Sequence, residues 1–302
     1  MPQPRTYSSI ESAVFSDRPV HLAIGIFDGV HLGHQTVIET AVHSARSTGG
    51  IAAVLTFRPH PSRLFRPDNP TRLLLDSWAQ AELFGRLGVD AVITHPFSRE
   101  FAAIPAEEFM PWLLARQPGL AGVYVGQNWR FGAGRKGDVA LLVESGRKAG
   151  VSVFSASPVQ LDGQPVTSTR IRALLGAGEI ALANTLLGYA YFASGQIVAG
   201  RQLARQIGFP TLNLPWDPEL RPRFGVYKVT VEGIPGVANY GVRPTVERAG
   251  LPVLETHLLG SCPWVTGDAL IVEWRKFIRP ERKFGSVQEL TAQIAVDVAA
   301  AR

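Results

Sequence analysis

Short apolar runs alternate with amphipathic stretches along the first half of the chain. Five runs are short, apolar and bounded by turn residues, which is typical of buried strands: residues 20–27, 50–57, 89–97, 121–126 and 151–157. Four stretches between them repeat apolar positions at helical spacing: residues 34–46, 77–88, 106–117 and 138–150. Strands that alternate with helices predict a parallel sheet with helices on both faces.

The pattern changes at about residue 188. Closely spaced strand-like runs separated by Gly, Pro and Asp follow, and they predict an antiparallel barrel: residues 191–200, 224–233, 236–242, 253–260 and 268–278. Residues 170–188 predict a helical connection between the halves. Residues 285–302 predict a C-terminal helix with Ser286 as its N-cap and Glu289 three residues on. We expect two domains, residues 1–186 and 187–302.

Composition narrows the class of protein. The 302 residues are 46% hydrophobic and 18% charged, as in an ordinary globular protein. The net charge of +5 comes without a basic block, which favours small polyanionic substrates over nucleic acid. The single cysteine, Cys262, excludes a disulfide within the chain and is most simply a packing residue. With no signal peptide or apolar membrane span, we expect a cytoplasmic protein that is a monomer or a weak homo-oligomer.

The stretch "GIFDGVHLGHQT", residues 25–36, raises three possibilities for His31 and His34. Residues three apart share a helix face and could ligate a metal, but no nearby Cys or acidic cluster completes a site. Two histidines in a glycine-rich turn are also poor core residues. A strand that leads through Gly29 and Gly33 to a helix start favours phosphate binding, because a helix N-terminus offers free N–H groups and a positive dipole end.

Four motifs then resemble bacterial FAD synthetases of the nucleotidylyltransferase superfamily. "GIFDGVHLGH" is similar to the family's G-x-F-D-G-x-H-x-G-H signature. "TFRPHP" (56–61), "VGQNWRFGAGRKGD" (125–138) and "VTSTRIR" (166–172) resemble its other motifs in the same order. The resemblance implies an α/β Rossmann-like nucleotidylyltransferase domain with a parallel sheet. In the family's reaction, FMN phosphate attacks the α-phosphorus of ATP and pyrophosphate leaves.

The resemblance also implies roles for particular residues. His31 and His34 would stabilise the ATP phosphates, and Arg172 would hold the leaving pyrophosphate from the opposite side together with Ser168 and Thr169. The implied ATP- and FMN-binding residues are Gly25, Phe27, Asp28, Gly29, Gly33, Asn128, Ser168 and Thr169. Asp28 would order the loop or the nucleotide, or else cap a turn. His60 stands between prolines and is either structural or functional.

One further pattern is a decoy. "GAGRKG" (132–137) matches G-x-G-x-x-G, but a dinucleotide-binding turn should follow its strand directly. Here "QNWRF" intervenes, and no acidic residue stands about 20 positions on. The sequence therefore disfavours a dehydrogenase.

The second half resembles riboflavin kinase. "GFPTLN" (208–213), "VANYGVRPTV" (237–246), "LETHLLG" (254–260) and "FIRPERKF" (277–284) are similar to that family's motifs. The resemblance implies an antiparallel β-barrel riboflavin kinase domain with a C-terminal helix. Glu255 would be the general base, and Thr211 and Asn213 would meet Mg²⁺. The implied ATP- and riboflavin-binding residues are Gly200, Arg205, Gly208, Pro210, Asn213 and Arg279.

Together the motifs predict a bifunctional enzyme that uses ATP and Mg²⁺ to make FMN from riboflavin and FAD from FMN. The chain departs from the family pattern at Ala204, Leu212, Pro165 and residues 261–266. Two alternatives stay open. Ala204 and residues 261–266 motivate the first, an FAD synthetase whose barrel is a degenerate flavin-binding domain. The second is a flavin sensor or carrier without ATP turnover.

Overall fold

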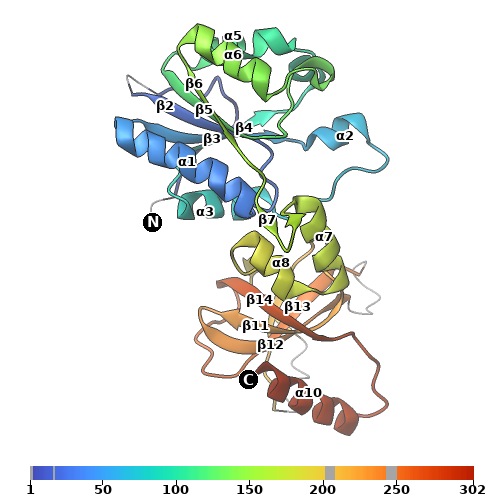
Figure 1. The fold of residues 1–302 in the computed structure, drawn as a ribbon. Helices are drawn as coiled ribbons and strands as arrows, with labels where there is room; N and C mark the ends of the chain where they lie inside the picture. Colours follow the sequence, from blue (N-terminus) through green and yellow to red (C-terminus); the bar gives the residue numbers. More distant parts are fainter. Residues whose placement is uncertain (1–2, 16–17, 201–207, 243–249) are drawn as a thin grey trace. The chain divides into compact units, whose positions relative to one another are not determined.

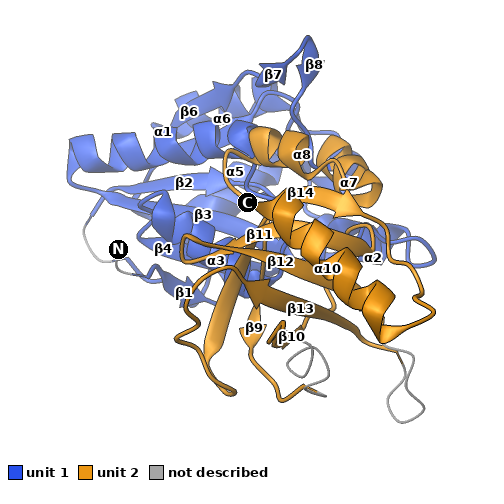
Figure 2. Cartoon of the chain, turned by 90° about the horizontal axis from the view of Figure 1, so that it is seen from below, with its two compact units in different colours: residues 1–168 blue, residues 169–302 orange. Residues whose placement is uncertain are grey.

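The computed structural model describes residues 3–15, 18–200, 208–242 and 250–302. Contacts between residues divide the chain into two compact units, Met1–Ser168 and Thr169–Arg302, which are coloured separately in Figure 2. Arg205 and Ala204, on which two expectations fall, lie outside the described residues.

The first unit contains a six-stranded parallel sheet. Its strands are β1 (Arg5–Tyr7), β2 (Val20–Ile24), β3 (Ile51–Arg58), β4 (Ala91–Pro96), β5 (Leu120–Gly126) and β6 (Ser152–Ala156), in the order β1-β4-β3-β2-β5-β6. From β2 the chain adds β3 and β4 on one side of the sheet. It then returns to place β5 and β6 on the other side of β2. The carboxyl ends of β2 and β5 therefore form a topological switch point, which is where open parallel sheets bind ligands.

Helices cover both faces of this sheet, as the alternating pattern predicts. The main helices are α1 (Leu32–Thr48), α3 (Ser77–Arg86), α5 (Phe109–Arg116) and α6 (Val139–Ala149). Figure 1 shows α1 and α3 on one face, with α5 and α6 on the other. Short elements complete the unit: α2 (Pro61–Phe65), α4 (Arg99–Ala102), the 3₁₀ turns Ala106–Glu108 and Ala133–Arg135, and the hairpin of β7 (Gln160–Leu161) and β8 (Gln164–Pro165). Apolar side chains such as Leu22, Leu55 and Leu113 form the core between sheet and helices.

The second unit is a nearly closed antiparallel barrel. Its strands are β9 (Phe192–Gln196), β10 (Leu212–Pro215), β11 (Gly225–Val231), β12 (Ile234–Val242), β13 (Pro252–Leu258) and β14 (Ala269–Arg279), in the order β10-β13-β12-β11-β14-β9. A bridge between Val198 and Asn213 joins the two edges. Fully buried aromatic side chains fill the interior, with Trp274 against Tyr227 and Tyr240.

In the described residues of the second unit there are three helices: α7 (Ser168–Ala177, whose first residue is counted with unit 1), α8 (Ile180–Leu187) and α10 (Val287–Ala301). The predicted helix over 170–188 is two helices, because Gly178 with φ of 85° ends the first. Ser286 is the N-cap of α10, where its Oγ accepts from the amide of Glu289 at 3.1 Å, as predicted. The contacts group α7 and α8 with the barrel, and the expected boundary at residue 186 stays a prediction.

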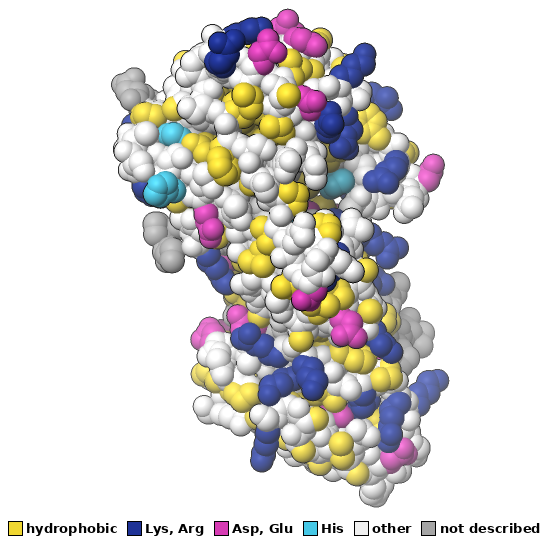
Figure 3. Space-filling model, in the orientation of Figure 1, with side chains coloured by type: hydrophobic (Ala, Val, Ile, Leu, Met, Phe, Trp, Pro, Cys, Tyr) yellow, Lys and Arg dark blue, Asp and Glu magenta, His cyan; other side chains and the backbone are white. Residues whose placement is uncertain are grey.

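Charges are mixed on the surface. On the face shown in Figure 3, the described Lys and Arg side chains lie interspersed with acidic and apolar side chains. This distribution matches the modest excess of basic residues in the sequence.

Candidate functional site

The loop between β2 and α1 holds its backbone in unusual conformations. Phe27, Gly29 and Val30 have φ of 50°, 83° and 38°, and a positive φ is a strained state for a β-branched residue such as Val30. The side chain of Gln80 on α3 holds the loop in this conformation. Gln80 donates from Nε2 to the carbonyl oxygens of Ile26 and Phe27 at 2.8 and 3.1 Å. The loop is thus held in place at the switch point before any ligand binds.

His31 and His34 stack on each other at the start of α1. Their ring centroids are 3.6 Å apart with 18° between the planes, and His31 is the N-cap residue. A Cβ at Gly33 would lie 3.4 Å from the His31 ring, so the ring packs directly over this glycine at van der Waals distance. The Nδ1 of His34 is buried and has no hydrogen-bond partner among the described residues. Two imidazoles at a helix N-terminus form a suitable setting for an anion.

Burial, together with the neighbouring His31 ring, lowers the pKa of His34 well below its usual range. His34 is therefore neutral at pH 7. A neutral imidazole still donates one hydrogen bond, and an approaching phosphate favours its protonated form.

This shift predicts acid sensitivity. The unfolded chain has a His pKa of about 6.5, so on acidification it binds protons that folded His34 does not bind. The free energy of unfolding should therefore fall as pH falls below about 6.5, and His34→Asn should reduce that slope. Burial also lowers the pKa of His21 and His95, so part of the slope should remain. Urea unfolding at several pH values measures how the free energy of unfolding depends on pH. His43→Asn, at an exposed position on the same helix, is the control, and equal slopes in wild type and His34→Asn would contradict the prediction.

Asp28 connects two distant segments of the chain to the loop. The residue is 4% exposed, and its carboxylate accepts from the amide of Leu74 at 2.9 Å. Its carbonyl oxygen accepts from the hydroxyl of Ser168 at 2.7 Å, across 140 residues of sequence. The structure thus brings Ser168 to the histidine loop. Thr169 and Arg172 lie on α7 in the second unit, so their approach to the histidines stays a prediction.

The Asn128 loop follows β5, the neighbour of β2 in the sheet. Asn128 is exposed in a turn closed by the amide of Trp129, which donates to the carbonyl of Gly126 at 2.9 Å. The glycines of "GAGRKG" have structural roles here: Gly132 has φ of 71°, and a Cβ at Gly137 would lie 2.8 Å from the Phe131 ring. The carboxylate of Asp138 caps the N-terminus of the following helix, α6, by accepting from the amide of Leu141. A bound dinucleotide would place its pyrophosphate at this helix end, so the cap agrees with the prediction against a dehydrogenase.

His60 has a structural role. It caps α2, where its Nδ1 accepts from the amide of Ser62 at 3.0 Å and lies 2.8 Å from the Ser62 hydroxyl. This arrangement favours the structural alternative for His60.

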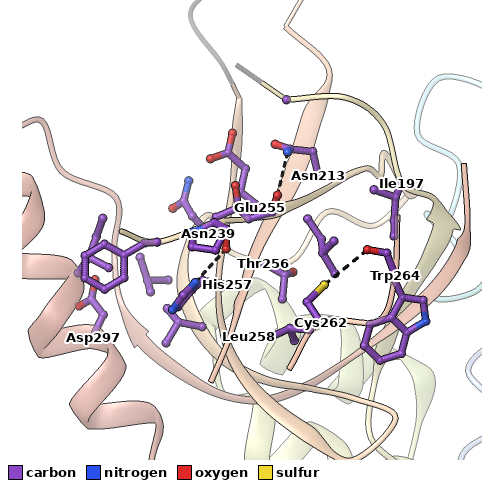
Figure 4. A pocket seen from close by; sticks show the side chains of 18 of the residues that line it. Ile197, Asn213, Asn239, Glu255, Thr256, His257, Leu258, Cys262, Trp264 and Asp297 are labelled. Atoms are coloured by element: carbon purple, nitrogen blue, oxygen red, sulfur yellow. Dashed lines mark hydrogen bonds between the residues drawn. The ribbon is translucent and has the colours of Figure 1, made fainter. Parts of the chain in front are cut away.

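The barrel carries a cavity of about 860 Å³. The predicted kinase residues Gly200, Pro210, Thr211, Asn213, Glu255 and Arg279 all line it. Figure 4 shows side chains of β13 along it, with Asp297 of α10 at one end and Trp264 at the other. Its size fits a pocket for small molecules. Gly208 has φ of 89° and is not among the lining residues.

Three polar side chains form a row across the cavity wall. Glu255 on β13 is the direct cross-strand neighbour of Asn213 on β10 and of Asn239 on β12, so the three side chains lie on one face. Glu255 is half-buried, and Nδ2 of Asn213 donates to the carbonyl of Thr211 at 3.3 Å. The hydroxyl, amide and carboxylate oxygens of Thr211, Asn213 and Glu255 are the hard donors that Mg²⁺ prefers.

Two contacts tie the Gly-Phe-Pro-Thr segment to His257, which stands two residues after Glu255 on β13 and therefore on the same face. Nδ1 of His257 lies 2.9 Å from the carbonyl oxygen of Pro210, and its ring meets Phe209 edge-on at 5.3 Å. Gly200 lies against the side-chain amide of Asn213, and a Cβ there would overlap it. The segment is therefore held on the same face of the barrel as Glu255.

Arg279 has a buried protein partner. Its guanidinium makes a bidentate ion pair with Asp297, with Nη2 to Oδ2 at 2.7 Å and Nε to Oδ1 at 2.9 Å. Asp297 is 2% exposed and belongs to α10. This pair anchors the C-terminal helix beside the cavity, so Arg279 shapes the cavity wall, and its contact with substrate stays a prediction.

Breaking this pair should destabilise the barrel. Asp297→Ala leaves Arg279 without its buried partner, and we expect the free energy of unfolding to fall by about 3 kcal/mol. Urea unfolding measures it. Asp217→Ala is the matched control, because the pair of Asp217 with Arg221 is exposed and should contribute about 1 kcal/mol or less. Equal effects of the two substitutions would contradict the assignment.

The sequence did not single out several of these residues. Gln80 and Asp297 act through contacts distant in sequence, and only their polarity inside predicted helices could have pointed to them. Asn239 stands in a quoted motif and went unassigned. The expectation for Cys262 is wrong: it is exposed on a loop, because the 261–266 stretch lies outside the strands.

In the described part of the chain, no cluster of three or more His, Cys, Asp or Glu could hold a metal ion. No helix there is both long and apolar enough to cross a membrane.

Comparisons with known proteins match each unit to an enzyme. The family model described as FAD synthetase matches residues 15–170, and the one described as riboflavin kinase matches residues 187–302. Among curated relatives, the bifunctional riboflavin kinase/FMN adenylyltransferase of Escherichia coli K12 is 39% identical over 93% of this chain and 91% of its own length. The Bacillus subtilis protein of the same name is 34% identical over 91% and 89%.

A solved structure shares the whole fold. A crystal structure described as a macrolide-efflux protein from Streptococcus pneumoniae covers 100% of this chain and 99% of its own, with a TM-score of 0.86 and 25% identity.

Proposed function

Because the chain belongs to the bifunctional riboflavin kinase/FMN adenylyltransferase family, we propose that it adenylylates FMN at the β2–α1 loop and phosphorylates riboflavin at the barrel cavity. The chain is a transferase with both activities: it makes FMN from riboflavin, and FAD from FMN with release of pyrophosphate. What is proposed is which residues carry each step.

Adenylyl transfer needs placed charges rather than a covalent intermediate. The FMN phosphate attacks the α-phosphorus of ATP, and negative charge moves onto the leaving pyrophosphate. The stacked imidazoles of His31 and His34 and the N-terminus of α1 would stabilise that charge. Ser168, Thr169 and Arg172 would hold the pyrophosphate, and Asn128 the flavin phosphate. The hydrogen bond from Ser168 to Asp28 supports this grouping.

Riboflavin phosphorylation needs a base and a way to hold the triphosphate. Glu255 would take the proton of the riboflavin 5′-hydroxyl as its oxygen attacks the γ-phosphate of ATP. The oxygens of Thr211 and Asn213 would hold Mg²⁺, which when bound neutralises charge on the β- and γ-phosphates. The amide of Asn239 is placed beside Glu255 by the strand register. The family resemblance also implies ATP or riboflavin contacts for Gly208, which does not line the cavity, and for Arg205, which lies outside the described residues.

The observation that carries the kinase assignment is the row Asn213–Glu255–Asn239 in the wall of the cavity. It brings a carboxylate and two amides from three separate motifs onto one face. The alternative of a synthetase with a degenerate barrel is not favoured, because the riboflavin kinase family model matches the entire barrel region and the curated relatives are bifunctional. We further propose a cytoplasmic protein that is a monomer or weak homo-oligomer.

A two-substrate assay tests the proposal. The protein is incubated with ATP and Mg²⁺ and either riboflavin or FMN, and the flavins are separated by chromatography. We expect FMN and then FAD from riboflavin, and FAD from FMN. FAD from FMN with no product from riboflavin would support the degenerate barrel. Tight flavin binding without any product would support a carrier.

A further inference from the structure

Cys262 is a thiol at the cavity of the barrel. It is exposed, lines the same cavity as Glu255, and its Sγ donates to the carbonyl oxygen of Trp264 at 3.6 Å. Figure 4 shows Cys262 and Trp264 at the end of the cavity away from Asp297. Both belong to the 261–266 stretch, where the sequence departs from the kinase pattern. The thiol therefore does not belong to the riboflavin kinase motifs on which the proposed function rests.

A buried hydroxyl points to a ligand in the same cavity. Thr256 is 1% exposed and lines the cavity, and its Oγ1 has no hydrogen-bond partner among the described residues. A buried polar group without a partner is unfavourable and rare in native proteins. A polar group of a bound substrate would satisfy it. Thr256 and Cys262 both line this cavity, and Figure 4 draws them near each other, so a ligand that satisfies the Thr256 hydroxyl would occupy space that the thiol borders.

We propose that Cys262 is a site of reversible modification by small disulfides, which switches off riboflavin phosphorylation and leaves FMN adenylylation intact. The inference rests on the proposed location of the kinase site in this cavity. The Cys262 thiolate attacks one sulfur of the disulfide, forms a new S–S bond and expels the other sulfur as a thiolate, which takes a proton from solvent. Cys262 is oxidised, and the departing half of the disulfide is reduced.

Two features make the switch selective. Cys262 is the single cysteine of the chain, so the adenylyltransferase unit has no thiol to modify. Solvent exposure gives a disulfide access, and the position at the cavity means that a peptide-sized adduct competes with substrate for the same space.

Oxidised glutathione on the full chain tests the inference. Intact mass measures the fraction of chains that carry one adduct, and the two activities are assayed in parallel. We expect kinase activity to be lost in proportion to the modified fraction, adenylylation of FMN to be unchanged, and dithiothreitol to restore the kinase. Cys262→Ser, of nearly the same size, should keep kinase activity and be insensitive to the disulfide. Riboflavin with ATP and Mg²⁺ should slow the modification of wild type.

Each remaining outcome is decisive. Absence of an adduct, a modified enzyme with full kinase activity, or equal modification rates with and without substrates would overturn the inference. Failure of the kinase assignment has a different signature, because the untreated protein would then make no FMN from riboflavin.

Discussion

Glu255→Gln should lower kcat for riboflavin phosphorylation by about 10²- to 10⁴-fold, the usual contribution of a general base. Glutamine keeps the size and polarity of the side chain, so the row with Asn213 and Asn239 should persist. It cannot take the proton of the riboflavin 5′-hydroxyl. FAD synthesis from FMN should be unchanged, because the adenylyltransferase residues belong to other motifs. Steady-state assays with riboflavin and with FMN measure both effects.

The matched control is Glu273→Gln. Glu273 also lies in the barrel, on β14, where it accepts from Thr230 and pairs with Arg275, and it does not line the cavity. We expect near wild-type kinase activity from this variant. A fully active Glu255→Gln enzyme, or equal losses in the two variants, would show that Glu255 is not the base.

His31→Ala is expected to lower FAD synthesis from FMN by about 10²- to 10³-fold, the usual effect of removing one donor to a developing negative charge. The His31 side chain makes no capping hydrogen bond to α1, so its loss should leave the helix start in place. FMN formation from riboflavin should be preserved. Pyrophosphate release with FMN and ATP measures the first activity, and chromatography of the flavins measures the second.

His43→Ala serves as its control, because His43 is exposed on the same helix. Loss of FAD synthesis in both variants would indicate damage to α1 rather than loss of a phosphate contact. Unchanged FAD synthesis in a folded His31→Ala protein would contradict the proposed role of the stacked histidines.

Much of the fold could be predicted because its signals are local. Periodicity places the strands β2 to β6 and the helices between them, and Gly-rich spacing marks the barrel. The strands that were not predicted are short, or they form only because of partners distant in sequence. The strand β1 exists because Arg5–Tyr7 pairs with Ala91–Ile93, and β10 because Leu212–Pro215 pairs with β13. A two-residue hairpin such as β7–β8 is too short for a periodic pattern.

The residues of the two sites also divide into those that local motifs predict and those that depend on tertiary contacts. Motifs predict His31, His34, Asn213 and Glu255, because each motif is a contiguous run of residues. The contact of Ser168 with Asp28 spans 140 residues and had to be built by the fold. The partner of Arg279 is a carboxylate on α10, 18 residues on, and its helix pattern gives no reason to choose it over other acidic residues. Side chains that act through tertiary contacts leave little trace in a single sequence.

The two reactions are assigned to two separate sites, the β2–α1 loop and the barrel cavity. Mixing the two variants tests this assignment directly, with riboflavin, ATP and Mg²⁺ supplied and the flavins separated by chromatography. We predict that His31→Ala alone accumulates FMN with little FAD, that Glu255→Gln alone leaves most of the riboflavin unconverted, and that the equimolar mixture makes FAD. A mixture that makes no FAD, although both proteins are folded and each retains its other activity, would contradict the account.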